Sequence, residues 1–253
     1  MTTSSRFAYV HARIQSRFAD LPVEEEWQRL AAARTLASFL EEARAGVLRE
    51  WVKGFSGQSD CHDLERGVRA LYGETATDVA GWVPRGWREA VLWTRWLTLL
   101  PLLQHLDLGG EMPVWVARDD FLHTLLGADG DLDPHRLADA GAGALLAADR
   151  DLPAVWASEW RRRWPPCKPA FLSNMEALST LIREHGETFI RARPDAAWTL
   201  RKSLRARLHL LFHRFLLQPA GPFIYLALTA LDLEHLRAAL VARALFAGRE
   251  ETP

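Results

Sequence analysis

The feature that most constrains the fold is a long, mostly apolar run near the end of the printed sequence, PFIYLALTALDLEHLRAALVARALF at residues 222–246. Its length raises the question of a membrane span, but it carries the polar side chains Asp232, Glu234, His235, Arg237 and Arg243. A charge at the centre of a spanning helix costs roughly 2.5–3.5 kcal/mol on insertion scales. Because leucines lie on more than one face, we expect a terminal core helix that is buried around much of its circumference.

The rest of the chain also reads as helical. Helix-forming Ala, Leu, Arg and Glu dominate nearly every segment, and β-branched alternation rarely lasts more than a few residues. We therefore predict an all-α fold of small stacked helical bundles. The predicted helices cover about 5–19, 23–32, 35–53, 62–72, 75–82, 84–106, 117–126, 134–147, 151–162, 170–191, 195–217 and 222–246.

Loops suggest how the chain is organised. No linker is long or low in complexity, so we expect a single all-helical domain over residues 1–253. The loop-rich section from DLGGEMP through GADGDLDP to RWPPCKP is the best place for a change of subdomain, and we expect the change near 107–134. Within this section, Asp133 precedes Pro134 as a helix N-cap.

Composition narrows the functional classes. The chain has 31 basic and 32 acidic side chains, so its net charge of -1 gives no sign of a general nucleic-acid binder. Cys61 and Cys167 stand far apart with no CxxC pair, which indicates a cytoplasmic protein without a disulfide framework. The N-terminal residues include no apolar stretch typical of a secretory signal.

One pair of histidines has metal-ligand spacing. His209 and His213 in RLHLLFHRF are four residues apart and project from one helix face, as paired metal ligands do. The sequence offers no HExxH pattern and no identifiable third ligand. We therefore favour packing histidines over a metal site, and expect no bound metal or cofactor.

A basic aromatic segment is the best candidate for a partner-binding site. EWRRRWPPCK holds Trp160, Arg161, Arg162, Arg163 and Trp164. These side chains could grip phosphate, lipid headgroups or an acidic partner. The alternative is a solvated helix end whose arginines complement the C-terminal helix dipole. Because the sequence has no phosphate-binding glycine loop, GxSxG elbow or dinucleotide fingerprint, we expect no catalytic residues and no enzymatic activity.

Both ends of the chain resemble one known family. The segment YLALTALDLEHLR resembles the closing helix of the V-type ATPase C/d-subunit family, with family-like positions at Tyr225, Leu226, Asp232, Leu236 and Arg237. Near the other end, YVHARIQSR is similar to the family's opening helix, with Tyr9, Arg13 and Ile14 in the expected spacing.

The resemblance implies a fold and a role. Family members are built of small helical bundles arranged as a multi-lobed funnel, and they join the rotary central stalk to the membrane ring. The resemblance thus implies a non-catalytic structural protein that couples the stalk to the ring. It implies stalk and ring proteins as partners, and a peripheral location at the inner face of a membrane. Two alternatives stay open: a helical adaptor or assembly protein without the rotary role, and a metal-binding helical protein using His209 and His213.

Overall fold

The structure is a computed structural model that describes residues 3–146 and 151–246. Among these residues there are thirteen α-helices, five short 3-10 segments and no β-strand, so the prediction of an all-α fold is confirmed. The chain divides into two compact units. Unit 1 comprises residues 1–88 and 166–253, and unit 2 comprises 89–165. The stretch 107–134, where the sequence suggested a subdomain change, lies wholly inside unit 2.

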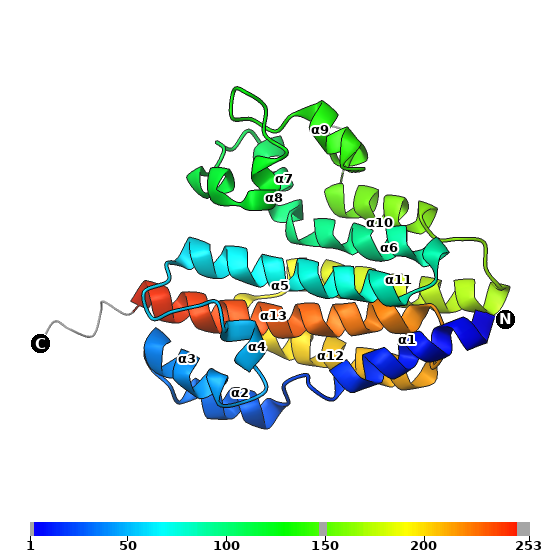
Figure 1. Cartoon of the computed structure of the whole chain (residues 1–253), viewed down its shortest axis with the longest axis horizontal. Helices are drawn as coiled ribbons and strands as arrows, with labels where there is room; N and C mark the ends of the chain where they lie inside the picture. Colours follow the sequence, from blue (N-terminus) through cyan, green and yellow to red (C-terminus); the bar gives the residue numbers. More distant parts are fainter. Residues whose placement is uncertain (1–2, 147–150, 247–253) are drawn as a thin grey trace, which may run out of the picture. The chain divides into compact units, whose positions relative to one another are not determined.

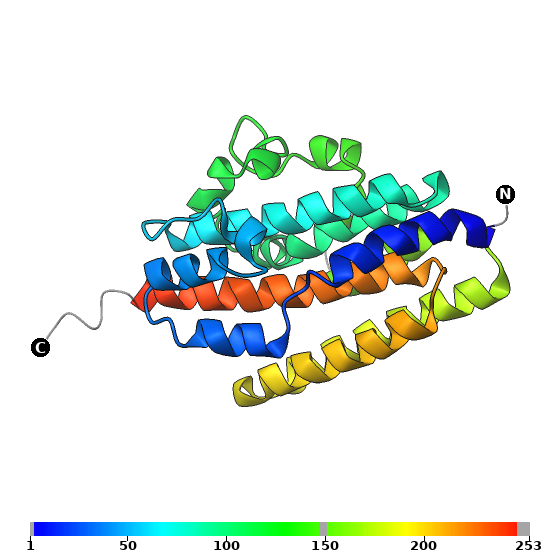
Figure 2. The ribbon, with the colours of Figure 1, turned by 60° about the horizontal axis from the view of Figure 1, so that its bottom comes forward.

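Unit 1 contains the longest helices together with three short ones (Figures 1 and 2). Its α-helices are α1 (Thr3–Phe18), α2 (Glu24–Ala31), α3 (Leu36–Arg44), α4 (Arg49–Val52), α5 (Cys61–Trp82), α11 (Pro169–Arg191), α12 (Ala197–Arg214) and α13 (Ala220–Phe246). Side-chain caps fix two of the starts. Asp60 accepts a hydrogen bond from the Asp63 amide at α5, and Thr35 forms a capping box with Ser38 at α3.

Helix α13 lies at the centre of unit 1, in contact with α1, α3, α5, α11 and α12 (Figure 1). Its leucines and aromatic residues are buried on several faces, which confirms the prediction of a core helix for 222–246. Its second half joins a core cluster with α2, α3, α4 and α5 that includes Leu30, Phe39, Leu64 and Leu236. In the described ranges, no helix combines the length and apolar character that crossing a bilayer requires.

Unit 2 is built from short elements. Its α-helices are α6 (Arg88–Trp93, whose first residue belongs to unit 1), α7 (Leu100–Asp107), α8 (Asp120–His123), α9 (Pro134–Asp139) and α10 (Leu152–Arg162). Between them lie the 3-10 segments Thr94–Thr98, Val114–Arg118 and Gly143–Leu146. The predicted N-cap is confirmed, because the Asp133 carboxylate accepts hydrogen bonds from the amides of His135 and Arg136.

Several predicted boundaries were wrong. The predicted helices 62–72 and 75–82 are one continuous helix, α5, in which the Thr75 hydroxyl donates to the Leu71 carbonyl one turn earlier. The predicted helix 84–106 is instead four short segments. Likewise 35–53 forms two helices, and 134–147 forms α9 and a 3-10 segment, with residue 147 outside the described residues.

Candidate functional site

The two family-like terminal segments lie in the same unit. Helix α1 contacts α13, and its Ile14 is buried against the unit 1 core. Tyr225 of α13 is also buried, and desolvation raises the pKa of its hydroxyl. Tyr9 and Arg13 point outward: Tyr9 is 59% exposed, and the Arg13 guanidinium lies 5.2 Å from the ring centre of Trp82. Some family-like positions are therefore core residues and others are surface residues.

Asp232 of α13 is the most deeply buried carboxylate that the structure describes, at 2% exposure. It forms an ion pair with Arg205 of α12, and Arg205 also donates to the Pro22 carbonyl oxygen at 2.9 Å. Its Oδ2 is buried without a hydrogen bond among the described residues. Burial raises the pKa of Asp232 to about 7, and the opposing effects of Arg205 and the Trp27 indole do not offset that shift.

His235 lies one turn after Asp232 and is held between two indoles. Its ring centre is 4.1 Å from Trp27 of α2 and 4.4 Å from Trp198 of α12. Burial is the main cause that lowers the pKa of His235 to about 4, and Lys202 and Arg205 lower it further. At neutral pH the imidazole is therefore uncharged, and it acts as an aromatic spacer between α2 and α12.

The last two family-like positions tie α13 to its other neighbours. Leu236 is fully buried in the core cluster. Arg237 forms an ion pair with Glu65 of α5 at 2.6 Å and lies 3.6 Å from Glu234. Together with the Asp232 pair, this arrangement joins α13 to helices on two sides. These side chains hold neighbouring helices together through ion pairs, because their charged groups are engaged in contacts within unit 1.

Two further ion pairs lie along α12. We call them, together with the Asp232–Arg205 and Arg237–Glu65 pairs, the polar seam of unit 1. Arg201 pairs with Glu234 at 3.2 Å, and Lys202 pairs with Glu24 at 2.7 Å. The contact with Lys202 is the largest cause that lowers the pKa of Glu24. These groups are substantially exposed, so each pair contributes little stability by itself. The buried pair at Asp232 therefore sets the energetics of the seam.

In unit 2, the predicted partner-binding segment lies at the end of α10. Trp160 is buried and stacks on Trp156 with ring centres 5.6 Å apart. Trp156 and Trp93 exchange hydrogen bonds, since each indole Nε1 donates to the other's carbonyl oxygen, at 3.3 and 3.0 Å. Trp164 packs edge-on against Trp160 at 5.0 Å, so the tryptophans of the segment belong to an interior aromatic cluster.

The three arginines of the segment differ in role. Arg163 lies over the ring of Trp93 at 3.8 Å, pairs with Glu159 at 2.7 Å and donates to the Gly141 carbonyl oxygen at 3.1 Å. Arg161 lies over the Trp164 ring at 5.8 Å. Arg162 is 74% exposed and shares Glu159 with Arg163. Of the predicted segment, Arg161 and Arg162 are thus the exposed side chains, and Arg163 is half-buried.

Glu159 holds the arginine pair together. Burial alone would raise its pKa, but the hydrogen bond from Arg163 and the charges of both arginines outweigh that effect, so the pKa is lowered. The carboxylate is therefore ionised at neutral pH, and its ion pair with Arg163 holds that guanidinium against the face of the Trp93 ring.

His209 and His213 pack against aromatic residues of unit 1. His209 meets Phe18 edge-on at 5.0 Å, and burial is the main cause that lowers its pKa. His213 is exposed, with its ring centre 6.4 Å from that of Phe18. Within residues 3–146 and 151–246, no group of three His, Cys, Asp or Glu side chains is placed to hold a metal ion. The structure thus brings no third ligand to this pair.

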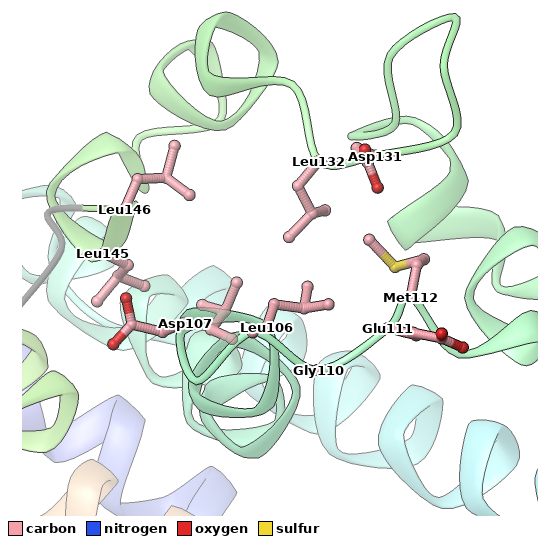
Figure 3. Close-up of a pocket in the computed structure, with 11 residues that line it drawn as sticks. Leu106, Asp107, Gly110, Glu111, Met112, Asp131, Leu132, Leu145 and Leu146 are labelled. Carbon is pink, nitrogen blue, oxygen red and sulfur yellow. The ribbon is translucent and has the colours of Figure 1, made fainter.

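Sequence reasoning missed the partners of Asp232 and His235, and it missed a cavity in unit 2. A carboxylate inside an apolar helix was a visible signal that some cation must meet it. Arg205, 27 residues earlier, was one of many candidates and could not be singled out. No periodicity indicates the cavity, which lies among loops and short helices (Figure 3).

No family model, curated protein or solved structure matches the chain.

Proposed function

We propose that this chain is a non-catalytic coupling protein similar to the V-type ATPase C/d-subunit family, acting through its protein surfaces. The observation that carries the proposal is the meeting of the two family-like segments. They are separated by most of the chain, yet they form the contacting helices α1 and α13 of one unit.

The polar seam supports the same role. A coupling protein must transmit force between partners without deforming. In unit 1, helix α13 is fixed to α12 through Asp232 and to α5 through Arg237, in addition to its apolar packing. Directional ion pairs and a close-packed interior both resist sliding of one helix past another.

The resemblance assigns partners to this role. They would be the rotary stalk and the membrane ring, and binding to the ring would hold the protein peripherally at the inner face of a membrane. Arg161 and Arg162 are both exposed in the segment from Trp160 to Trp164, and Arg162, at 74% exposure, suits an acidic surface on such a partner.

The test is affinity purification of the tagged full chain from its own cells, followed by quantitative mass spectrometry. We expect stalk and ring proteins of a rotary ATPase to be recovered in fixed ratio with the chain. Arg162→Glu should lower this recovery about tenfold, as for the loss of one favourable contact of about 1.4 kcal/mol. The matched control is Arg193→Glu, which reverses a charge that is also exposed.

Recovery of the chain with none of those proteins would overturn the proposal. A stable complex with other proteins would favour the helical adaptor or assembly role instead. Equal recovery with Arg162→Glu and wild type would remove the segment 160–164 from the interface while leaving the coupling role supported.

A further inference from the structure

Unit 2 contains a cavity of about 600 Å³ (Figure 3). Its volume lies within the range of about 300–1,000 Å³ that is usual for binding sites. The cavity is walled by the end of α7, by the loops that follow α7 and α8, and by the 3-10 segment before residue 147. All of its lining residues belong to unit 2.

The interior of the cavity is apolar. The side chains of Leu106, Met112, Leu132 and Leu146 point into it from different sides in Figure 3. Leu145 belongs to the buried core of unit 2 and forms part of the wall. Since the centre of the cavity is surrounded by carbon and sulfur, an occupant must present apolar groups there.

The rim of the cavity is acidic. Asp107, Glu111 and Asp131 line it, and Figure 3 shows their carboxyl groups around the edge rather than at the centre. All three are exposed, none forms an ion pair with a described residue, and none of the lining residues that the structure describes is basic. The surrounding segment 107–139 holds eight carboxylates and two arginines in a chain whose net charge is only -1. The edge therefore favours cations.

The walls are fixed before any occupant arrives. His105 Nε2 donates to the Glu111 carbonyl oxygen at 3.0 Å, and the Gly110 amide donates to the His105 carbonyl oxygen at 2.9 Å. A Cβ at Gly110 would stand 2.3 Å from the imidazole, so only glycine permits this approach. Across the cavity, the Gly127 amide donates to the Asp131 carbonyl oxygen at 2.7 Å. A preformed site saves the entropy of ordering its loops on binding.

Apolar surface continues beyond the cavity. Leu108 and Val114, next to the lining residues in sequence, are 80% and 81% exposed. A small molecule confined to the cavity would leave these side chains in water. It would also place its cationic group either in the apolar centre or against one side of the rim. A larger partner can cover the exposed leucine and valine and meet carboxylates on several sides.

We infer that this acidic-rimmed cavity binds a basic amphipathic helix of a partner protein. Such a helix presents apolar side chains at i, i+3 and i+4 and carries lysine or arginine on the flanks of that face. Its apolar side chains enter between Leu106, Leu132 and Met112. Its flanking cations meet the rim carboxylates. The inference rests on unit 2 alone and does not depend on the coupling role proposed above.

The test uses the full chain and a fluorescent peptide of about 15 residues, long enough to form a helix, that repeats Leu-Lys-Lys-Leu. Two peptides of equal length serve as comparisons: Leu-Glu-Glu-Leu repeats reverse the charge, and Ser-Lys-Lys-Ser repeats remove the apolar face. Fluorescence anisotropy measures each dissociation constant. We expect only the Leu-Lys-Lys-Leu peptide to bind.

Variants locate the binding. Asp107→Asn, Glu111→Gln and Asp131→Asn together should weaken binding about tenfold or more. The matched control is the triple change Glu89→Gln, Asp120→Asn and Asp139→Asn, which removes three exposed carboxylates of unit 2 that do not line the cavity. It should leave the affinity unchanged. Circular dichroism checks that both triple variants stay folded.

Four results would overturn the inference. Equal binding of the Ser-Lys-Lys-Ser peptide, or equal loss in both triple variants, would show attraction by net charge alone. Displacement of the peptide by a short alkylamine at comparable affinity would indicate a small-molecule site. Self-association of the chain that is abolished by the cavity variants would assign the cavity to a second copy.

Discussion

The long helices of unit 1 and the short segments of unit 2 are held in place by different kinds of contact. In unit 1, α5, α11 and α13 have 22, 23 and 27 residues, and α5 and α11 both contact α13, whose apolar side chains are buried on several faces. In unit 2, the α-helices have 4 to 11 residues. Helices this short are marginal by themselves, so other contacts must fix them.

In unit 2 those contacts run from side chain to backbone. The Trp93 and Trp156 indoles bond to each other's carbonyl oxygens, Arg163 reaches the Gly141 carbonyl, and Arg136 donates to the Leu126 carbonyl at 2.5 Å. The comparison teaches that the two units depend on such contacts to different degrees. Unit 1 also has them, as from Arg205 to the Pro22 carbonyl oxygen, but there they supplement the packing of long helices, and the most buried polar group, Asp232, is paired inside an apolar core.

The largest effect is expected when the buried pair of unit 1 is broken. Arg205→Met leaves the Asp232 carboxylate buried without its partner, which should cost about 3–5 kcal/mol of unfolding free energy at pH 8. At pH 5 the loss should be smaller, because a pKa near 7 means that Asp232 is already protonated there. Hydrogen exchange of the α13 amides measures this loss in unit 1 separately from unit 2.

A matched double variant distinguishes the pair from packing. Arg205→Met with Asp232→Leu removes both charges and should restore stability to within about 1 kcal/mol of wild type, or above it. A double variant as unstable as the single one, or a single variant with equal loss at both pH values, would contradict this account of the seam.

A smaller effect is expected at the aromatic cluster of unit 2. Arg163→Met removes the ion pair with Glu159, the hydrogen bond to Gly141 and the contact with Trp93, at a cost of about 2–3 kcal/mol. The loss should lower exchange protection in α10 and leave α13 unchanged. Arg162→Met is the control, since this exposed arginine should contribute less than about 1 kcal/mol. If Arg163→Met and Arg162→Met lowered exchange protection in α10 equally, the contacts of Arg163 with Glu159, Gly141 and Trp93 would not stabilise unit 2.

The same contrast explains what sequence could predict. The helix predicted for 222–246 is α13, and that predicted for 170–191 is α11 to within one residue. Both segments are long, and their own pattern of apolar residues is enough to indicate a helix. The predicted helix 84–106 was wrong. Helix α6 ends at Trp93, whose carbonyl oxygen accepts a hydrogen bond from the indole of Trp156, 63 residues away, and the sequence does not show that contact. Asp232 was visible as a charge in an apolar run, but its partner Arg205 follows only from how α12 packs on α13.

The smallest net effect in the wild-type chain is the pH dependence of unit 1, because two contributions to it oppose each other. Between pH 4 and 7 the folded chain holds a proton on Asp232 that the unfolded chain releases, so this group lowers stability as pH rises. His235 acts oppositely between pH 4 and 6.5, because there the unfolded chain holds the extra proton. The two contributions oppose each other, each with a slope of at most about 1.4 kcal/mol per pH unit.

Single variants should separate the two slopes. Relative to wild type, Asp232→Asn should make α13 gain protection as pH rises from 4.5 to 6.5, and His235→Phe, which keeps the aromatic stack, should make it lose protection. The His235 contribution should be the smaller, since its half-buried ring is partly screened by solvent. Exchange rates corrected for intrinsic pH dependence give both slopes. All other titrating groups are common to the three proteins. Parallel profiles would therefore mean that neither Asp232 nor His235 titrates away from its ordinary pKa and that burial in unit 1 does not shift these groups.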